Sequence, residues 1–185
     1  MTEQVLEKLK QEMEATLAAL RRELTRLRTG RATTALLDGV TVDYYGSRTP
    51  LNQVATLSVP EPRLIVVQPF DRSILHDIER AIQQSDLGLN PINDGKIIRV
   101  PIPELTEERR KELVRHVRKV CEEYRVSMRN HRREAVERLK AMLKNKEISE
   151  DDERRALEKV EALTKTYIEK VDQALKHKEA EILEV

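Results

Sequence analysis

Aromatic residues and cysteine are scarce in this chain. Of its 185 residues 3% are aromatic, comprising one Phe, four Tyr and no Trp. Sequence-specific recognition of single-stranded nucleic acid usually depends on stacking bases on such side chains, so that function is disfavoured. The single cysteine, Cys121, has no second cysteine with which to form an internal disulfide or a zinc knuckle. The simplest interpretation of Cys121 is a small buried hydrophobic residue, with a reactive thiol as the alternative.

Long hydrophobic runs and catalytic motifs are also missing. No apolar run approaches the roughly 18 to 20 residues of a membrane-spanning helix, and the first residues lack the basic-then-apolar order of a signal peptide. We therefore expect a soluble, cytoplasmic protein with no membrane partner. The five glycines are scattered, and the chain has no phosphate-binding loop, no His-Glu-x-x-His pair and no nucleophile elbow. We predict no catalytic residue, no metal ligand and no cofactor, and we interpret His131 as a structural residue on a helical core face.

Charge is abundant, although it nearly cancels. The chain has 34 Lys and Arg against 33 Asp and Glu, so that 36% of the residues are charged while the net charge is +1. The signs are not evenly distributed. Residues 105–146 contain 14 basic and 7 acidic residues, whereas residues 147–185 contain 7 basic and 12 acidic ones. A basic segment is therefore followed by an acidic one.

Helical periodicity marks three long segments. Between residues 6 and 27 apolar residues recur at alternating steps of three and four, which indicates one side of a helix of about 25 residues. The same spacing recurs from residue 113 to 142 and from residue 157 to 182. Thr106 is a candidate N-cap for the second helix, and Ser149 with Asp152 has capping-box spacing at the start of the third. A short loop between the second and third helices makes them antiparallel neighbours.

The stretch between the first two helices has a different pattern. β-Branched runs at residues 40–44, 54–59, 64–67 and 97–100 predict strands, and the apolar residues from 74 to 82 predict one short helix. We therefore predict an α+β protein, in which an elongated antiparallel three-helix bundle, residues 1–30 and 105–185, is interrupted by a small inserted α+β (β/α/β) domain, residues 31–104.

The chain crosses between these two parts only twice. The first crossing contains Thr29, Gly30 and Arg31, and the second, at residues 101–104, contains Pro101 and Pro103. Because no other covalent link sets the angle of the insert, a hinge at these residues is a natural hypothesis. The alternative is a rigid elbow, since proline restricts its own φ and the residue before it.

An arginine ridge runs along the second helix. Arg118, Arg125, Arg129 and Arg132 each follow a predicted core residue by one position, which places them about 100° from the buried stripe, and Arg133 flanks them. One interpretation is a solvated face beside the acidic third helix. The other is a surface that follows phosphates, favoured because Arg grips phosphate bidentately and the run 129–133 contains no acid. An elongated helical bundle with such an arginine ridge is suited to contact the backbone of folded RNA and to recognise its shape.

Several short sequence segments, taken in order, resemble those of the bacterial ribosome recycling factors over essentially the whole chain. The order and spacing of the segments, more than any single one, carry the resemblance. They include Arg-Thr-Gly-Arg-Ala at 28–32, Leu-Leu-Asp-Gly at 36–39, Tyr-Tyr-Gly at 44–46, Thr-Pro-Leu at 49–51, Phe-Asp-Arg-Ser at 70–73, Ser-Asp-Leu-Gly-Leu-Asn-Pro at 85–91, Ile-Arg-Val-Pro at 98–101, Leu-Thr-Glu-Glu-Arg-Arg-Lys at 105–111, Arg-Asn at 129–130, Arg-Arg at 132–133 and Lys-Glu-Ile-Ser-Glu-Asp-Asp at 146–152. One departure is Thr34, where the family commonly has proline.

The resemblance implies a translation factor that, with elongation factor G and GTP, splits the post-termination ribosome into subunits for reuse. It implies an L-shaped molecule with the outline of a transfer RNA, whose bundle lies on rRNA of the large subunit and whose insert meets elongation factor G. We expect it to act as a monomer. Carried over by position, the expected rRNA-binding residues are Arg129 and Arg132, followed by Arg28, Arg110, Asn130 and Arg133.

The competing hypothesis is a non-enzymatic helical adaptor or scaffold that packs on another protein, with the charges serving only for solubility. Salt distinguishes the two, because RNA binding weakens steeply with salt whereas an apolar protein contact does not.

Overall fold

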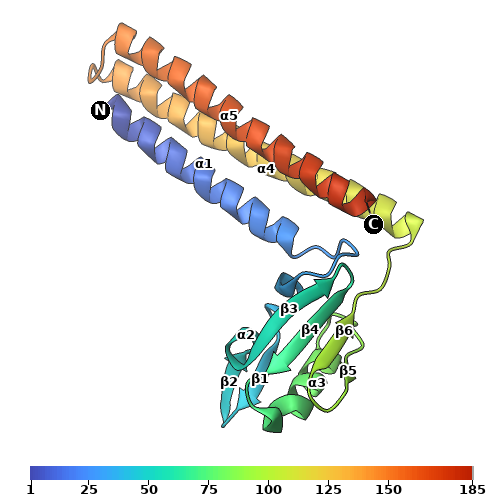
Figure 1. Cartoon of the computed structure of the whole chain (residues 1–185). Coiled ribbons are helices and arrows are strands. Elements are labelled where there is room, and N and C mark those ends of the chain that lie inside the picture. Colours follow the sequence, from blue (N-terminus) through green and yellow to red (C-terminus); the bar gives the residue numbers. More distant parts are fainter. Residues whose placement is uncertain (185) are drawn as a thin grey trace. The chain divides into compact units, whose positions relative to one another are not determined.

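A computed structural model describes residues 1–184, which divide into two compact units (Figure 1). The bundle unit comprises residues 1–25 and 111–184, and the insert unit comprises residues 26–110. Within residues 1–184 no helix combines the length and apolar character needed to cross a membrane.

Three helices make up the bundle: α1 (Thr2–Thr25), α4 (Glu107–Lys144) and α5 (Glu150–Leu183). Figure 1 shows the start of α1 beside the turn between α4 and α5, so α1 runs antiparallel to α4 and parallel to α5. With 38 residues, α4 is about 57 Å long at 1.5 Å per residue. The predicted three-helix bundle is confirmed.

The predicted apolar stripes form the bundle core, with small shifts at their ends. On α1, Val5 is buried in place of Leu6, which is half-buried. On α4, the predicted stripe from residue 113 to 142 is buried at Leu113, Val117, Val120, Met128, Ala135, Leu139 and Met142, whereas Tyr124 and His131 are half-buried. The polar atoms of these two side chains bond α1: the Tyr124 hydroxyl donates to Glu23 at 2.8 Å, and His131 Nε2 lies 2.9 Å from the Thr16 hydroxyl oxygen.

The predicted caps are confirmed at the starts of α4 and α5. Thr106 Oγ1 accepts from the backbone N–H of Arg109 at 3.1 Å. Ser149 and Asp152 each accept the backbone N–H of the other through the side chain, at 3.1 Å in both cases, which is a complete capping box. Local sequence therefore determines where both long helices begin.

The insert contains two antiparallel sheets. The smaller one pairs β1 (Thr41–Tyr44) with β2 (Ser47–Pro50). The larger one has the order β3-β4-β6-β5, and its strands are β3 (Ala55–Glu61), β4 (Leu64–Pro69), β5 (Ile92–Asn93) and β6 (Ile98–Pro101). The α+β class is confirmed, and the structure adds β2 and β5, which the sequence patterns did not predict.

The helices of the insert are short. They are η1 (Thr34–Leu37), α2 (Leu51–Val54), η2 (Arg72–Ile74) and α3 (Leu75–Gln84). The apolar face of α3, including Ile78 and Ile82, is buried in the same core as the sheet residues Ile65, Val67 and Ile98. Thr34 begins η1, capped by the Thr33 hydroxyl, which accepts from the backbone N–H of Ala35 at 3.3 Å.

Both chain crossings are hydrogen-bonded to the turn between β3 and β4. The backbone N–H of Ala32 donates to Pro62 O at 2.7 Å, and that of Ile102 donates to Arg63 O at 2.8 Å. Pro101 is the last residue of β6 and pairs with Leu64. The chain without regular structure at the two crossings is therefore residues 26–33 and 102–106. Thr29 is 4% exposed, and Gly30 has φ +82°, which favours glycine.

Candidate nucleic-acid interface on helix α4

Most arginines of the ridge face the acidic helix α5 and form ion pairs with it. Arg118 Nε lies 2.6 Å from Glu179, Arg125 Nη2 lies 2.6 Å from Asp172, and Arg132 Nη1 lies 3.2 Å from Glu161. The basic and acidic segments of the sequence therefore meet across the α4–α5 interface, as the interpretation of a ridge beside the acidic third helix expected.

Arg125 is the most buried of these arginines, with a side chain 18% exposed. Burial opposes its charge, but hydrogen bonds to Glu122 and Asp172 raise the pKa of Arg125 above its ordinary value. A guanidinium held by two carboxylates in this way serves the α4–α5 contact. Arg125 is therefore a structural residue and not a candidate for RNA binding.

Arg129 pairs within its own helix. Its Nη1 lies 3.2 Å from Glu122, and its side chain is half exposed. Hydrogen bonds donated by Arg125 and Arg129 hold the pKa of Glu122 below its usual value. The run 129–133 contains no acid, but Glu122, two turns earlier, and Glu161 of α5 supply partners to Arg129 and Arg132. The absence of an acid within the run 129–133 therefore does not leave these two arginines unpaired.

The outward side of α4 carries the more available charge. Arg133 and Asn130 are exposed, and within residues 1–184 neither side chain forms an ion pair or hydrogen bond. Val126, one turn before Asn130, is 45% exposed. We call Val126, Arg129, Asn130 and Arg133 the outer patch of α4. Sequence reasoning missed Val126, whose signal is an apolar residue outside the periodic buried stripe.

The remaining two predicted residues belong to the insert unit. The Arg28 guanidinium donates to Asp86 O at 3.4 Å, and its Nη1 approaches Gly88. Arg110 is half-buried, and its Nε is buried without a hydrogen-bond partner among the described residues. The six predicted residues are thus divided between two units. Arg129, Asn130, Arg132 and Arg133 lie together in the bundle part of α4, whereas Arg28 and Arg110, the latter in the first turn of α4, belong to the insert unit.

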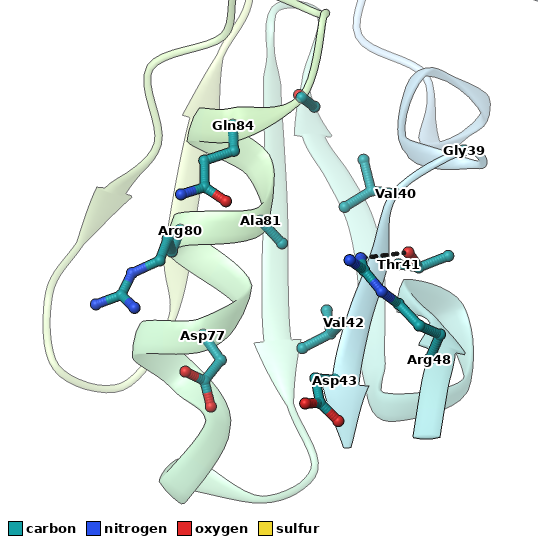
Figure 2. A pocket seen from close by; sticks show the side chains of 11 residues that line it. Gly39, Val40, Thr41, Val42, Asp43, Arg48, Asp77, Arg80, Ala81 and Gln84 are labelled. Carbon is teal, nitrogen blue, oxygen red and sulfur yellow. Dashed lines mark hydrogen bonds between the residues drawn. The ribbon is translucent and has the colours of Figure 1, made fainter. Parts of the chain in front are cut away.

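The insert also contains an open pocket of about 490 Å³ between β1 and α3 (Figure 2). Asp43 and Asp77 lie on its two opposite walls, while Arg48 donates to Thr41 Oγ1 at 3.3 Å. Arg80 extends away from β1 in this view. Acidic and basic side chains are mixed here, and none of the six predicted RNA-binding residues lines the pocket.

The fold places the chain in a defined class: a three-helix bundle interrupted by an α+β insert. A family model described as ribosome recycling factor matches residues 20–183. The chain belongs to the ribosome recycling factor family. The resemblance seen in the sequence segments is thereby confirmed.

Relatives match over the full length. The ribosome-recycling factors of Halalkalibacterium halodurans, Syntrophus aciditrophicus and Bacillus subtilis are 56%, 55% and 51% identical over 185 residues, covering both chains completely. A solution structure of the ribosome recycling factor matches with a TM-score of 0.81 and 43% identity, covering 100% of this chain and 98% of that one. A second structure, described as models for the T. thermophilus ribosome recycling factor and the E. coli elongation factor G bound to the E. coli post-termination complex, matches with a TM-score of 0.68 and 47% identity, covering 99% of each chain.

Proposed function

We propose that this protein is a cytoplasmic translation factor that, with elongation factor G and GTP, disassembles the post-termination ribosomal complex into reusable subunits. The observation that carries the proposal is the full-length match to a recycling factor described together with elongation factor G on a post-termination complex. The protein acts as a monomer and catalyses no reaction. GTP hydrolysis in the partner supplies the work.

The bundle binds rRNA of the large subunit through α4. Arg129 and Arg133 lie one turn apart on the outer patch and present guanidinium groups at the surface, and Asn130 adds a neutral donor. Arg fits phosphate oxygens in a bidentate arrangement and remains charged at any physiological pH. Contacts of this kind position a protein on folded RNA without reading its sequence.

Arg132 joins this surface by exchanging its protein partner for a phosphate. Its ion pair with Glu161 leaves the arginine side chain 44% exposed, and an exposed pair of this kind contributes only about 0.2–1 kcal/mol. A charge-assisted hydrogen bond to RNA contributes about 1.5–3 kcal/mol, so the exchange favours binding. Arg28 and Arg110 form a separate set of contacts from the insert unit.

The insert transmits force from elongation factor G. Residues 26–33 and 102–106 form its only covalent connections to the bundle and act as the hinge, which includes Thr29, Gly30, Arg31 and Pro103, while Pro101 anchors the second crossing to the sheet. Tyr45 and Phe70, 85% and 69% exposed, supply the aromatic contacts that protein interfaces favour. They lie near each other, because Tyr45 is close enough to Asp71, the residue after Phe70, to add to the effect of the Ser73 N–H in lowering the pKa of that carboxyl.

Light scattering of post-termination ribosomes tests the function directly. We expect a fall in scattering only when this protein, elongation factor G and GTP are all present, and no fall when any one is omitted. Splitting without elongation factor G, or no splitting with the complete set, contradicts the proposal.

The salt dependence of binding to large subunits separates RNA binding from an adaptor role. Each phosphate contact lowers the slope of log K against log salt by about 0.7 to 0.9, so several contacts produce a steep decline. A flat salt dependence would show that the bundle docks on protein.

A further inference from the structure

Three potential metal ligands converge between α1 and α4, away from the outer patch. Glu12 lies on α1, and His131 and Glu134 lie one turn apart on α4. One ligand atom from each lies within 4.8 Å of the other two. The surrounding shallow depression has an apolar base of Val5, Leu9 and Ala135, with Lys8 and Arg138 at its border.

Hydrogen bonds determine which nitrogen of His131 carries a proton. The Thr16 hydroxyl donates its only proton to the backbone carbonyl of Glu12 at 2.9 Å. His131 Nε2 lies 2.9 Å from the same hydroxyl oxygen, which has only lone pairs left to offer. Nε2 must therefore be the donor, and a neutral His131 ring carries its lone pair on Nδ1.

That lone pair faces another acceptor. His131 Nδ1 lies 3.4 Å from the Glu12 carboxylate oxygen Oε2. Only a proton on Nδ1 or a metal ion between the two atoms can make this contact favourable. A metal-binding histidine has this arrangement: the ligating nitrogen faces the carboxylates, and the other N–H is held by an acceptor outside the coordination sphere.

We propose that Glu12, His131 and Glu134 bind a divalent transition-metal ion of the Zn²⁺ class. One imidazole and two carboxylates suit this ion, which takes nitrogen and oxygen ligands at about 2.0–2.2 Å and accepts water in a fourth position. The three ligand atoms must close from the 4.8 Å limit to about 3.3 Å, the ligand separation around a tetrahedral ion of that bond length. Rotation of the two glutamate side chains supplies this movement.

The charges around the site are compatible with one divalent ion. Its two carboxylates balance the charge of the metal. Lys8 Nζ lies 3.8 Å from Glu12 Oε1, the carboxylate oxygen other than the one facing His131, and the Lys8 side chain is 53% exposed, so it has room to move away. The positive charge of Arg138, which lines the same depression, reduces the affinity. The ion would link α1 to α4 and so stabilise the bundle in proportion to its free concentration.

The full chain, freed of metal with a chelator, is titrated with Zn²⁺ and with Co²⁺ near pH 8. We expect saturable binding of one ion, visible absorption of bound Co²⁺ in the range of a nitrogen- and oxygen-ligated site, and a rise in melting temperature with Zn²⁺. Glu134→Gln should weaken binding more than about 10-fold, because loss of a ligand exceeds the 10- to 100-fold cost of losing an outer partner. Glu134 is exposed and forms no ion pair or hydrogen bond within residues 1–184, so its replacement leaves the fold intact.

Glu137→Gln is the matched control, since it removes an exposed carboxylate one turn further along α4 and should leave affinity unchanged. His131→Gln should abolish the Co²⁺ spectrum. The site is overturned by the absence of saturable binding, or by equal binding in the Glu134→Gln variant, which would show that Glu134 is not a ligand. Nitrogen NMR showing protons on both ring nitrogens of His131 near pH 8, with no change on adding Zn²⁺, would also overturn it. Ribosome splitting in chelator tests the proposed function separately.

Discussion

On α4 the guanidinium of Arg132 donates from Nη1 to both carboxylate oxygens of Glu161 on α5, at 3.2 and 3.3 Å. The pair is exposed, with side chains 44% and 61% accessible. Its contribution to folding is therefore small, about 0.2–1 kcal/mol. Glu161 consequently orients Arg132 through a weak ion pair, in which a phosphate group can replace the carboxylate.

Arg132→Ala should weaken binding to large ribosomal subunits by about 1.5–3 kcal/mol, because it removes a charge-assisted hydrogen bond to RNA. Glu161→Gln removes the competing carboxylate and should leave affinity unchanged or increase it. Both dissociation constants are measured at one fixed salt concentration, with urea unfolding to confirm that each variant is folded. An unchanged affinity for Arg132→Ala would remove this residue from the RNA surface.

Arg133→Ala should weaken subunit binding and lower the salt slope by about one unit, since it removes one phosphate contact. Arg129→Ala should do the same, with a smaller loss of affinity because Glu122 already neutralises part of its charge. Lys165→Ala on α5, which also removes one exposed positive charge, is the control and should change neither quantity. Equal effects for all three variants would indicate that the affinity depends on the net charge of the protein and not on the outer patch of α4.

Lengthening both linkers should separate binding from splitting. A Gly-Ser insertion after Gly30 together with one after Pro103 relaxes both crossings, so the insert no longer transmits force to the bundle. We expect unchanged affinity for large subunits and loss of splitting in the light-scattering assay. The same dipeptide inserted after Gly95, in the exposed turn between β5 and β6, is the control and should split normally. Normal splitting by the double-linker variant contradicts the proposal that the insert transmits force to the bundle.

Tyr167 should make the bundle sensitive to alkaline pH. Burial, together with the hydrogen bond that its hydroxyl donates to Glu14, raises the pKa of Tyr167 to about 12. Its value in an unfolded chain is about 10, so the stabilisation is complete below pH 10 and is lost as pH rises toward 12.

Tyr167→Phe should therefore lower stability at neutral pH by about 0.5–1.5 kcal/mol and reduce the decline between pH 10 and 12. Urea unfolding of both proteins across this range measures the effect. Parallel pH profiles for the two proteins would show that the Tyr167 hydroxyl is not responsible.

Cys121 should be unreactive in the folded protein. Its side chain is fully buried, and burial raises the pKa of the thiol to about 11, while the thiolate is the reactive species. We expect no reaction with a thiol-specific disulfide reagent at pH 8 until urea unfolds the chain, and then one thiol per molecule. Rapid labelling under native conditions would favour the reactive-thiol interpretation instead.

The features that depend on neighbours in sequence were predictable. Periodicity located the three long helices, and Thr106 and the Ser149–Asp152 pair marked two of their starts, because capping bonds join residues three positions apart. The small elements were harder. Strand β5 has only two residues. Strand β2 has four, and three of them are polar and exposed or partly exposed. Neither strand therefore forms an apolar run. Their pairing with β6 and β1 defines them.

The sequence by itself determined the helical periods, the caps, the opposite charges of the second and third helices and the family resemblance, since each depends on composition or on residues close in the chain. Only the tertiary structure decided which arginines of α4 pair with acidic residues and which side chains surround His131. Glu161 lies 29 positions from Arg132, and Thr16 lies 115 from His131. Contacts over such separations exist only after the helices pack, because packing alone sets which faces of α1, α4 and α5 meet.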